Sequence, residues 1–218
     1  MKSCILFDWD GTLVDNFSVI KGGLNAVFTH FDMPLWDDET ARRNIRLTAK
    51  DLFAKTFPAV DDTSKALEIY LGHVERNHLA EISIISGAAA FLESLHAIDG
   101  LKLGIVSNKT QRFLDAEIAH LGWQDYFSVQ IGAGTAVKDK PHPDSISLAL
   151  EKLGKNAVET RYIGDTHTDM LAAYNAGVEP VFVTYGLGSV RDLSSDVLGG
   201  ALPKIIDTYP DLLDFLTR

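Results

Sequence analysis

The sequence has little cysteine, little positive charge and no long apolar segment. It contains one cysteine, Cys4, in 218 residues, so the chain cannot form an internal disulfide, and a reducing compartment fits this composition. Cys4 lies within a short apolar run, where a small buried core residue is a better explanation than a reactive thiol. No segment approaches the roughly 20 apolar residues that a transmembrane helix needs. These absences favour a cytoplasmic protein without a membrane partner.

Basic residues are outnumbered by acidic ones. The chain has 20 Lys and Arg against 30 Asp and Glu, which gives a formal net charge of −10. It has no run of Lys or Arg, so nucleic acid is not an expected partner. A phosphate-bearing small molecule is compatible with this balance only where positive charge is concentrated locally. The 46% hydrophobic content is ordinary for a globular chain, and the length suits one full domain with a smaller one.

Short apolar runs that end in polar residues or glycine alternate with stretches of helical spacing. Because the runs are nearly continuous, they are typical of strands in a parallel sheet that is covered by helices on both faces. The predicted strands are CILF (4–7), LGIVSN (103–108), SVQIGAG (128–134), RYIGD (161–165) and PVFVTYG (180–186). The predicted helices between them are 111–122, 142–154 and 168–177, each of which ends at a glycine.

One region breaks this alternation. From about residue 16 to residue 81 the sequence shows no convincing strand, and four stretches have helical spacing. We interpret the region as an inserted helical domain that covers the carboxyl ends of the strands. The predicted division is 1–15 with 84–218 for the α/β core and 16–83 for the inserted domain.

Polar residues follow four of the predicted strands. In an open parallel sheet, ligands bind just beyond the carboxyl ends of the strands, so these residues should converge. In chain order they are Asp8 and Asp10, then Ser107, Asn108 and Lys109, then Lys138 and Lys140, then Asp165 and Asp169.

The two acids after the first strand pose the sharpest question. Two like charges about 4 Å apart cost several kcal/mol at an effective dielectric constant of about 20, so Asp8 and Asp10 need compensation. A cluster of carboxylates suits Mg²⁺, which prefers hard oxygen ligands. With a metal present, Asp8 can attack phosphorus and Asp10 can transfer protons. One lysine, for which we favour Lys140, supplies positive charge to the phosphoryl group.

Each motif also has a simpler structural interpretation. The DGT sequence can be an ordinary turn, and Ser107 can cap a helix. Pro143 can start a helix, and Asp169 can be one of the acids that favour a helix N-terminus. The convergence of four motifs favours the functional interpretation over these.

Taken together, the motifs resemble those of the haloacid dehalogenase superfamily, in the branch with a helical cap after the first strand. FDWDGTLVD is similar to its first motif, IVSNK to the second, KPHPD to the third and IGDTHTDM to the fourth. The resemblance implies a Rossmann-like parallel sheet with an α-helical cap. It also implies that Asp8 is the nucleophile, Asp10 the acid/base, and Lys140 rather than Lys138 the third-motif lysine.

The same resemblance implies the remaining site residues. Thr12, Ser107 and Asn108 would bind phosphate, and Asp8, Asp10, Asp165 and Asp169 would form the Mg²⁺ site. The pattern is most similar to phosphoglycolate phosphatases, with one departure in the cap. Arg46 stands where those enzymes usually have glycine, and we expect Arg46, with Arg43, to contact the distal end of the substrate.

The expected function is therefore a Mg²⁺-dependent phosphomonoester hydrolase that acts on a small metabolite through an aspartyl-phosphate, as a monomer or homodimer. Asp10 distinguishes it from the family's dehalogenases and phosphonatases, which lack this second acid. Two alternatives stay open: a phosphomutase of the β-phosphoglucomutase type, and a non-catalytic module that binds a phosphorylated ligand. The presence of Asp10 disfavours the second, because a binding module does not need it.

Overall fold

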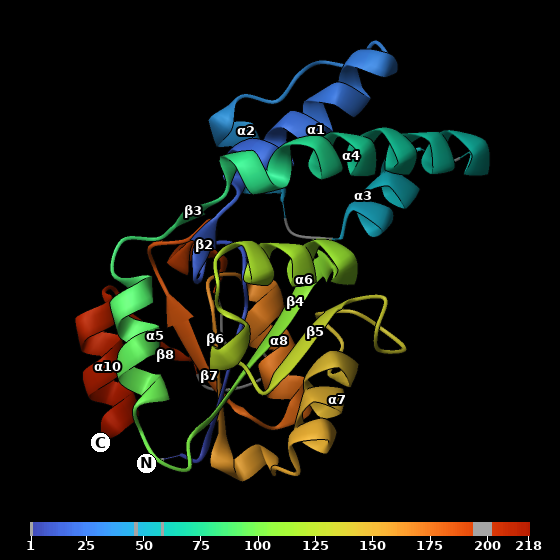
Figure 1. Ribbon diagram of the computed structural model, residues 1–218. Coiled ribbons are helices and arrows are strands. Elements are labelled where there is room, and N and C mark those ends of the chain that lie inside the picture. The colour runs from blue at the N-terminus through green and yellow to red at the C-terminus, as the bar shows by residue number, and fades with distance from the viewer. Residues whose placement is uncertain (1, 46–47, 58, 194–201) are drawn as a thin grey trace. The chain divides into compact units, whose positions relative to one another are not determined.

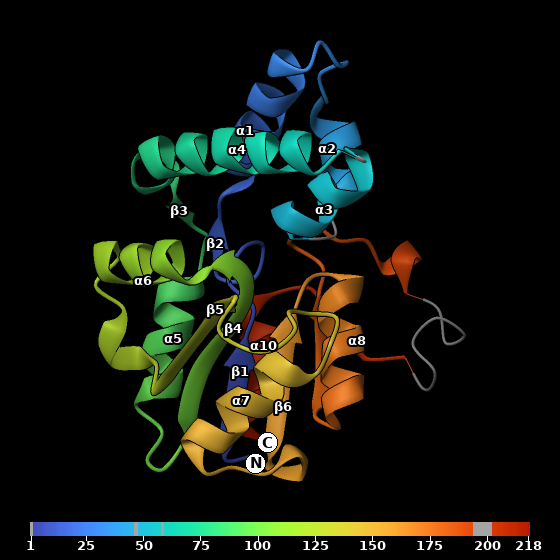
Figure 2. The same ribbon diagram turned by 90° about the vertical axis from the view of Figure 1, so that its right-hand side faces the viewer.

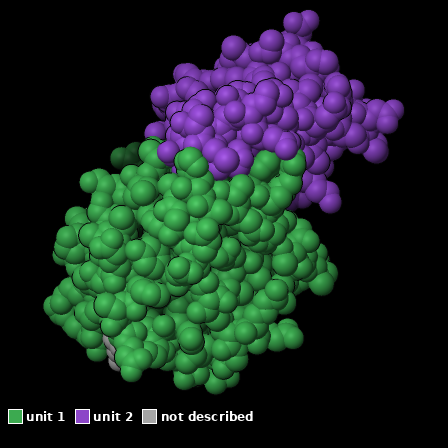
Figure 3. Space-filling model, in the orientation of Figure 1, with its two compact units in different colours: residues 1–15, 83–218 green, residues 16–82 purple. Residues whose placement is uncertain are grey.

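The computed structural model describes residues 2–45, 48–57, 59–193 and 202–218. The chain divides into two compact units, coloured separately in Figure 3. Residues 1–15 and 83–218 form the first, here called the sheet unit, and residues 16–82 form the second, the helical unit. The division predicted from the sequence differs from this one only at Ser83.

The sheet unit is built on a parallel sheet, so the predicted α/β class is confirmed (Figure 1). Its strands in spatial order are β5 (Val129–Ala133), β4 (Lys102–Thr110), β1 (Cys4–Phe7), β6 (Thr160–Gly164), β7 (Glu179–Val183) and β8 (Lys204–Ile206). The chain starts in the middle of the sheet and extends it first to one edge and then to the other. This order creates a switch point beside β1, where ligands bind in such sheets.

Helices cover both faces of this sheet (Figures 1 and 2). Leu6 faces the core formed with α7 (Asp144–Leu153) and α8 (His167–Ala176). Phe7 points to the opposite face, where its ring meets Phe91 of α5 (Ala88–His96) edge-on at 5.9 Å. Phe91 in turn packs on Tyr209 of α10 (Tyr209–Thr217). Successive side chains of a strand alternate between faces, so the continuous apolar run of β1 supplies both cores.

Two further strands form a short ribbon beside the sheet. β2 (Val14–Asp15) pairs in antiparallel fashion with β3 (Ser83–Ile84). The ribbon, β8 and α5 were not predicted from the sequence. The ribbon strands have two residues each and β8 has three, which is too short for a periodic pattern to emerge.

The helical unit contains the helices predicted for this region. They are α1 (Phe17–His30), α2 (Asp38–Asn44), α3 (Ala49–Thr56) and α4 (Val60–Glu81). Asp37 and Thr48 begin α2 and α3 by accepting hydrogen bonds from the backbone N–H groups of Thr40 and Asp51. Within the described residues of this unit, the structure contains no strand.

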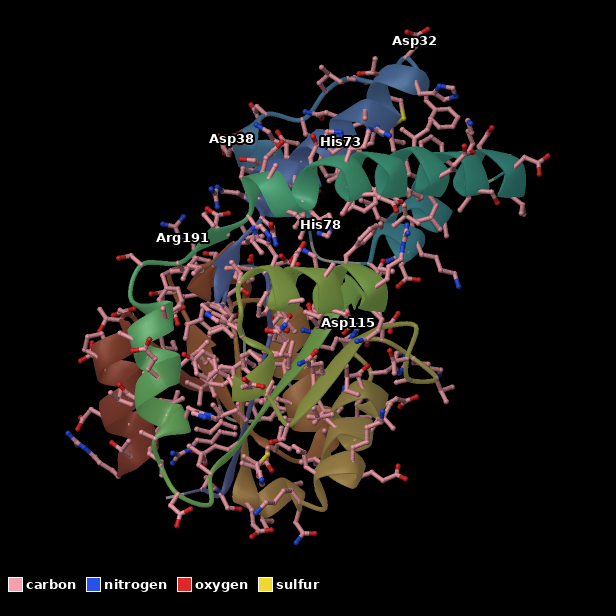
Figure 4. All side chains as sticks on the ribbon, viewed as in Figure 1. Asp32, Asp38, His73, His78, Asp115 and Arg191 are labelled. Carbon is pink, nitrogen blue, oxygen red and sulfur yellow. The ribbon has the colours of Figure 1, made fainter. Side chains whose placement is uncertain are left out.

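Glycine in α1 allows α4 to approach closely. A Cβ on Gly22 would lie 2.6 Å from Nε2 of His73, and one on Gly23 would lie 2.8 Å from the Tyr70 ring. Figure 4 marks His73 on α4. The core of the unit lies between these helices and includes Phe53, which is fully buried.

The core of the helical unit gives the first testable prediction. Phe53→Ala should lower the free energy of unfolding by about 3–5 kcal/mol, because it removes a buried ring and leaves a cavity. Urea denaturation measures this loss. Val60→Ala is the control, since Val60 is 78% exposed and surface changes usually stay within about 0.5 kcal/mol. Equal effects of the two substitutions would contradict the assignment of Phe53 to this core.

Candidate active site

The parallel register places the motif residues at one edge of the sheet. Phe7 is paired with Ile105 of β4 on one side and with Ile163 of β6 on the other. The residues that follow these strands, among them Asp8 and Asp165, therefore emerge together at the carboxyl end of the sheet. The backbone N–H of Asp8 continues the ladder by donating to the carbonyl oxygen of Ile163 at 2.8 Å.

Lys140 is the cation at the centre of this edge. Its Nζ lies 2.9 Å from Oδ1 of Asp8 and 2.6 Å from Oδ1 of Asp169. It also donates to the hydroxyl of Tyr162 at 2.7 Å. The contacts with Asp169 and Tyr162 are hydrogen bonds, whereas the contact with Asp8 is an ion pair. Burial opposes the charge on Lys140, but the carboxylates of Asp169 and Asp8 outweigh it and raise the Lys140 pKa.

Asp169 serves both the helix and the site. It is the third residue of α8 and forms a capping box with Thr166, whose backbone N–H donates to Asp169 Oδ2 at 2.9 Å. Its other oxygen, Oδ1, pairs with Lys140. The structural interpretation of this acid as a helix-capping residue and the functional one as a site residue are therefore compatible, because each uses a different oxygen.

Asp165 is enclosed by the chain segment that follows β7. Its Oδ2 accepts hydrogen bonds from the backbone N–H groups of Leu187 and Gly188, at 2.6 and 3.4 Å. A Cβ on Gly186 would lie 2.2 Å from the same oxygen, so only glycine allows this approach. Oδ1 accepts from the hydroxyl of Thr12 at 3.3 Å. Thr12 is thus engaged with a carboxylate in this structure, whereas the sequence predicted it as a phosphate ligand.

Three of the predicted metal ligands lie together. Ligand oxygens of Asp8, Asp165 and Asp169 lie within 4.8 Å of one another, and hard carboxylate oxygens suit a divalent cation such as Mg²⁺. Burial and the charge of Asp169 raise the pKa of Asp8 to about 6, although Lys140 opposes this. Burial, then Asp169 and Asp8, raise the pKa of Asp165 well above its ordinary range. The positive charge of one lysine does not balance the negative charge of three carboxylates. A cation would neutralise this excess of negative charge.

The carboxylate of Asp10 has a different neighbour. Nζ of Lys109 lies 2.9 Å from Oδ1 and 3.2 Å from Oδ2 of Asp10. The same Nζ lies 3.0 Å from Oε1 of Glu117. Burial opposes the charge on Lys109, but Asp10 and Glu117 outweigh it and raise the Lys109 pKa. That Asp10 also binds the metal stays a prediction.

Ser107 and Asn108 lie at the end of β4. The hydroxyl of Ser107 is buried and accepts from the backbone N–H of Lys109 at 3.3 Å. The side chain of Asn108 bonds the backbone of Lys140 on both sides, donating to its carbonyl at 2.9 Å and accepting from its N–H at 3.0 Å. Asn108 therefore fixes the loop that carries the central lysine.

Several other predicted or considered residues lie elsewhere. Arg46 falls outside the described residues. Arg43 belongs to α2, is largely exposed, and pairs with Glu39 at 2.6 Å. Lys138 is exposed whereas Lys140 is buried, so Lys140 is the third-motif lysine that reaches the carboxylates.

The sequence did not reveal the roles of Tyr162, Glu117 and Gly186. Tyr162 is an interior residue of β6 and Glu117 an interior residue of α6 (Gln111–His120), where each fits an ordinary pattern. A polar residue on the buried side of α6 was the one available signal for Glu117, since charged residues are seldom fully buried unless they are paired.

Comparison with known proteins identifies relatives over the whole length of the chain. A sequence model of the haloacid dehalogenase-like hydrolases matches residues 5–183. The phosphoglycolate phosphatase of Rhodospirillum rubrum is 31% identical, with 99% of this chain and 91% of the relative covered. That of Colwellia psychrerythraea is 30% identical, with 100% and 98% covered.

A solved structure agrees with the sequence relatives. A haloacid dehalogenase-like family hydrolase from Streptococcus pneumoniae superposes with a TM-score of 0.85 at 25% identity, with 99% and 98% of the two chains covered. In addition, no helix in the described part of this chain is long and apolar enough to cross a membrane.

The excess of negative charge in the carboxylate cluster predicts that divalent cations stabilise the fold in a pH-dependent way. The folded-state pKa of Asp8, about 6, lies above its ordinary value of 3.8. Without a cation, the protonated acid favours the folded state below pH 4, and this contribution is lost as pH rises to 6. A cation binds the ionised acids, so its stabilisation should be larger at about pH 8 than at about pH 5.

Thermal unfolding with and without Mg²⁺ measures this effect. At a Mg²⁺ concentration about 100 times its Kd, the stabilisation is about 2.7 kcal/mol, or roughly 5–10 °C for a chain of this size. The variant Asp165→Asn should lose most of this increase at pH 8. An equal increase at both pH values, or an Asp165→Asn variant that responds as the parent does, would contradict the assignment.

Proposed function

Because the chain belongs to the haloacid dehalogenase-like hydrolases and is a phosphatase of that family, we propose that it hydrolyses a small phosphomonoester by phosphoryl transfer to Asp8. The observation that carries the proposal is the position of Asp8 among its neighbours. Of the three clustered carboxylates it is the most accessible, at 7% exposed, against 0% for Asp165 and 1% for Asp169. Asp8 is therefore the carboxylate that an incoming phosphorus can reach.

The other two carboxylates support a metal ion in this proposal. Asp165 and Asp169, together with Asp8, would hold Mg²⁺. When bound, the ion supplies positive charge that lets an anionic carboxylate approach an anionic phosphate. The backbone donors to Asp165 and the capping box of Asp169 fix both side chains before any ligand arrives. Preorganised groups of this kind need no rearrangement at the moment of reaction.

Proton transfer is the proposed role of Asp10. In the first step an oxygen of Asp8 bonds to phosphorus and the ester P–O bond breaks, while Asp10 donates a proton to the departing oxygen. In the second step water attacks phosphorus, its proton passes to Asp10, and the bond from Asp8 to phosphorus breaks. Phosphate leaves, and both acids return to their starting states.

The remaining polar groups bind and orient the phosphoryl group. Ser107 and the backbone N–H of Asn108 lie at the end of β4, beside the strand that carries Asp8, and we propose that they donate to its oxygens. Lys140 acts by holding Asp8 and Asp169 in place through its ion pairs with both. We retain Thr12 as a candidate phosphate ligand, although here it contacts Asp165.

The helical unit is the proposed cap. It is inserted between Asp15 and Ser83, which are paired with each other in the ribbon, so its two connections to the sheet unit are adjacent. A unit joined in this way can open to admit substrate and close to exclude water. We propose that Arg46, with Arg43, selects the distal end of the substrate. The relatives named as phosphoglycolate phosphatases make phosphoglycolate the first candidate.

Phosphate release from a panel of phosphorylated metabolites and from 4-nitrophenyl phosphate tests the proposal. The parent protein should be active with Mg²⁺ and inactive with EDTA. Asp8→Asn should lower kcat by at least about 10⁴-fold on every substrate, because an amide cannot serve as the nucleophile. Circular dichroism would show that the variant is folded.

Three results would contradict the proposal. A folded Asp8→Asn variant with parental kcat would show that Asp8 is not the nucleophile. Full activity in EDTA would show that the reaction does not need a divalent metal ion. Isomerisation of a sugar phosphate without net phosphate release would instead support the phosphomutase.

A further inference from the structure

Behind Asp10 lies a buried set of charged and polar groups that the proposed mechanism does not use. It consists of Trp9, Lys109 and Glu117, here called the Asp10 support. Glu117 and Trp9 are both fully buried, and the side chain of Lys109 is 7% exposed. Burying a carboxylate and an ammonium costs several kcal/mol per ion unless each is well paired. The pairing within this set leads directly to Asp10.

The contacts of the Asp10 support form a closed ring. Lys109 Nζ lies 2.9 Å from Asp10 Oδ1 and 3.0 Å from Glu117 Oε1, so it bridges the two carboxylates. The second oxygen of Glu117, Oε2, accepts from the indole Nε1–H of Trp9 at 2.7 Å. Trp9 precedes Asp10 in the chain, and the peptide bond between them closes the ring. The side chain of Asp10 and its own backbone are thus fixed by the same carboxylate.

Aromatic packing also supports the ring of contacts. The indole of Trp9 meets that of Trp123 edge-on, with ring centroids 5.8 Å apart and planes at 84°. Lys109 is near the end of β4 and Glu117 is on α6, the next helix, so the ring joins the segment after β1 to a segment that is distant in sequence. A lysine side chain is a flexible four-carbon stem. Glu117 restricts that freedom because it holds the same ammonium group that contacts Asp10.

We propose that Glu117 and Lys109, with Trp9, are positioning residues that hold the Asp10 carboxyl where it can protonate the leaving oxygen. This inference rests on the proposed function, in which Asp10 is the acid/base. The alternative is that the buried ions merely stabilise the fold. Buried ion pairs can often be replaced without loss of stability, so stability measurements alone cannot distinguish these roles. A measurement of proton donation can.

Substrates with different leaving groups report on proton donation. The 4-nitrophenolate ion leaves readily without a proton, whereas an alkoxide does not. The parameter kcat/KM reports steps up to departure of the leaving group, so later hydrolysis of the enzyme intermediate does not affect it. Misplacing Asp10 should therefore lower kcat/KM for an alkyl phosphate much more than for 4-nitrophenyl phosphate. General acid catalysis contributes about 10²–10⁴-fold, which bounds the effect.

Glu117→Gln is the main variant. It keeps the size of the side chain and one acceptor oxygen, and it removes the charge that holds Lys109. We expect kcat/KM to fall about 10- to 100-fold for an alkyl phosphate from the panel and by less than about 3-fold for 4-nitrophenyl phosphate. Trp9→Phe is the milder second variant, which should show the same selectivity to a smaller degree and serves if Glu117→Gln does not fold. Circular dichroism and thermal unfolding establish folding.

Glu179→Gln is the matched control. Glu179 pairs with Arg161 at 3.2 Å, in an ion pair that contacts none of the site residues. The same chemical change there should leave the ratio of the two kcat/KM values at the parental value. A shift of the ratio in this control would mean that the ratio does not report on Asp10, and would overturn the inference.

Asp10→Asn separates this inference from the proposed function. Asp10→Asn should itself lower kcat/KM selectively for the alkyl phosphate. Adding Glu117→Gln to it should cause no further selective loss, because both changes remove the same contribution, proton donation by Asp10. If Asp10→Asn is selective but folded Glu117→Gln and Trp9→Phe are not, the inference is wrong and the proposed function stands. If Asp10→Asn lowers kcat/KM equally for both substrates, the acid/base role of Asp10 is wrong, and the inference fails with it.

Discussion

The attraction between one buried ammonium group, that of Lys140, and the carboxylates around it is the interaction on which the site depends. Lys140 contacts Asp8 and Asp169 directly, while Asp165 is held by backbone donors from the segment after β7. One positive charge among three buried acids leaves a net negative site. Burial and then the charge of Asp169 raise the pKa of Asp8, and the net negative charge favours the binding of a divalent cation there. The chemistry we propose uses the same imbalance, because a cation makes Asp8 available to an anionic phosphate.

The fold positions this cluster through the register of a parallel sheet. β1 lies between β4 and β6, so the residues after all three strands emerge side by side. Local features then set individual side chains. The capping box of α8 orients Asp169, the side chain of Asn108 fixes the Lys140 loop, and Gly186 allows the backbone to enclose Asp165. Each feature serves folding as well as the candidate site, so the clustered carboxylates are placed by ordinary elements of secondary structure.

Much of this could be predicted from the sequence because the signals are local. Continuous apolar runs identify the strands of the sheet, and the polar residues after them, such as Asp8 and Asp165, predict the edge at which the carboxylates cluster. What could not be predicted depends on contacts between distant segments. Glu117 meets Trp9 across 108 positions of the chain, and Tyr162 resembles any strand residue until the structure brings it to Lys140. The ribbon of β2 and β3 is too short for periodicity to reveal, and its pairing is again a property of the folded chain.

The central claim is that a phosphoryl group is transferred to Asp8, and the mass of the peptide containing Asp8 tests it most directly. The parent protein is mixed with Mg²⁺ and a substrate on which it is active in the panel. The reaction is quenched in acid within the first turnover, and the protein is digested and analysed by mass spectrometry. The account predicts that this peptide gains the mass of one phosphoryl group, and that the gain disappears as substrate is exhausted. If phosphate accumulates while the peptide remains unmodified at every time point, phosphoryl transfer to Asp8 is contradicted.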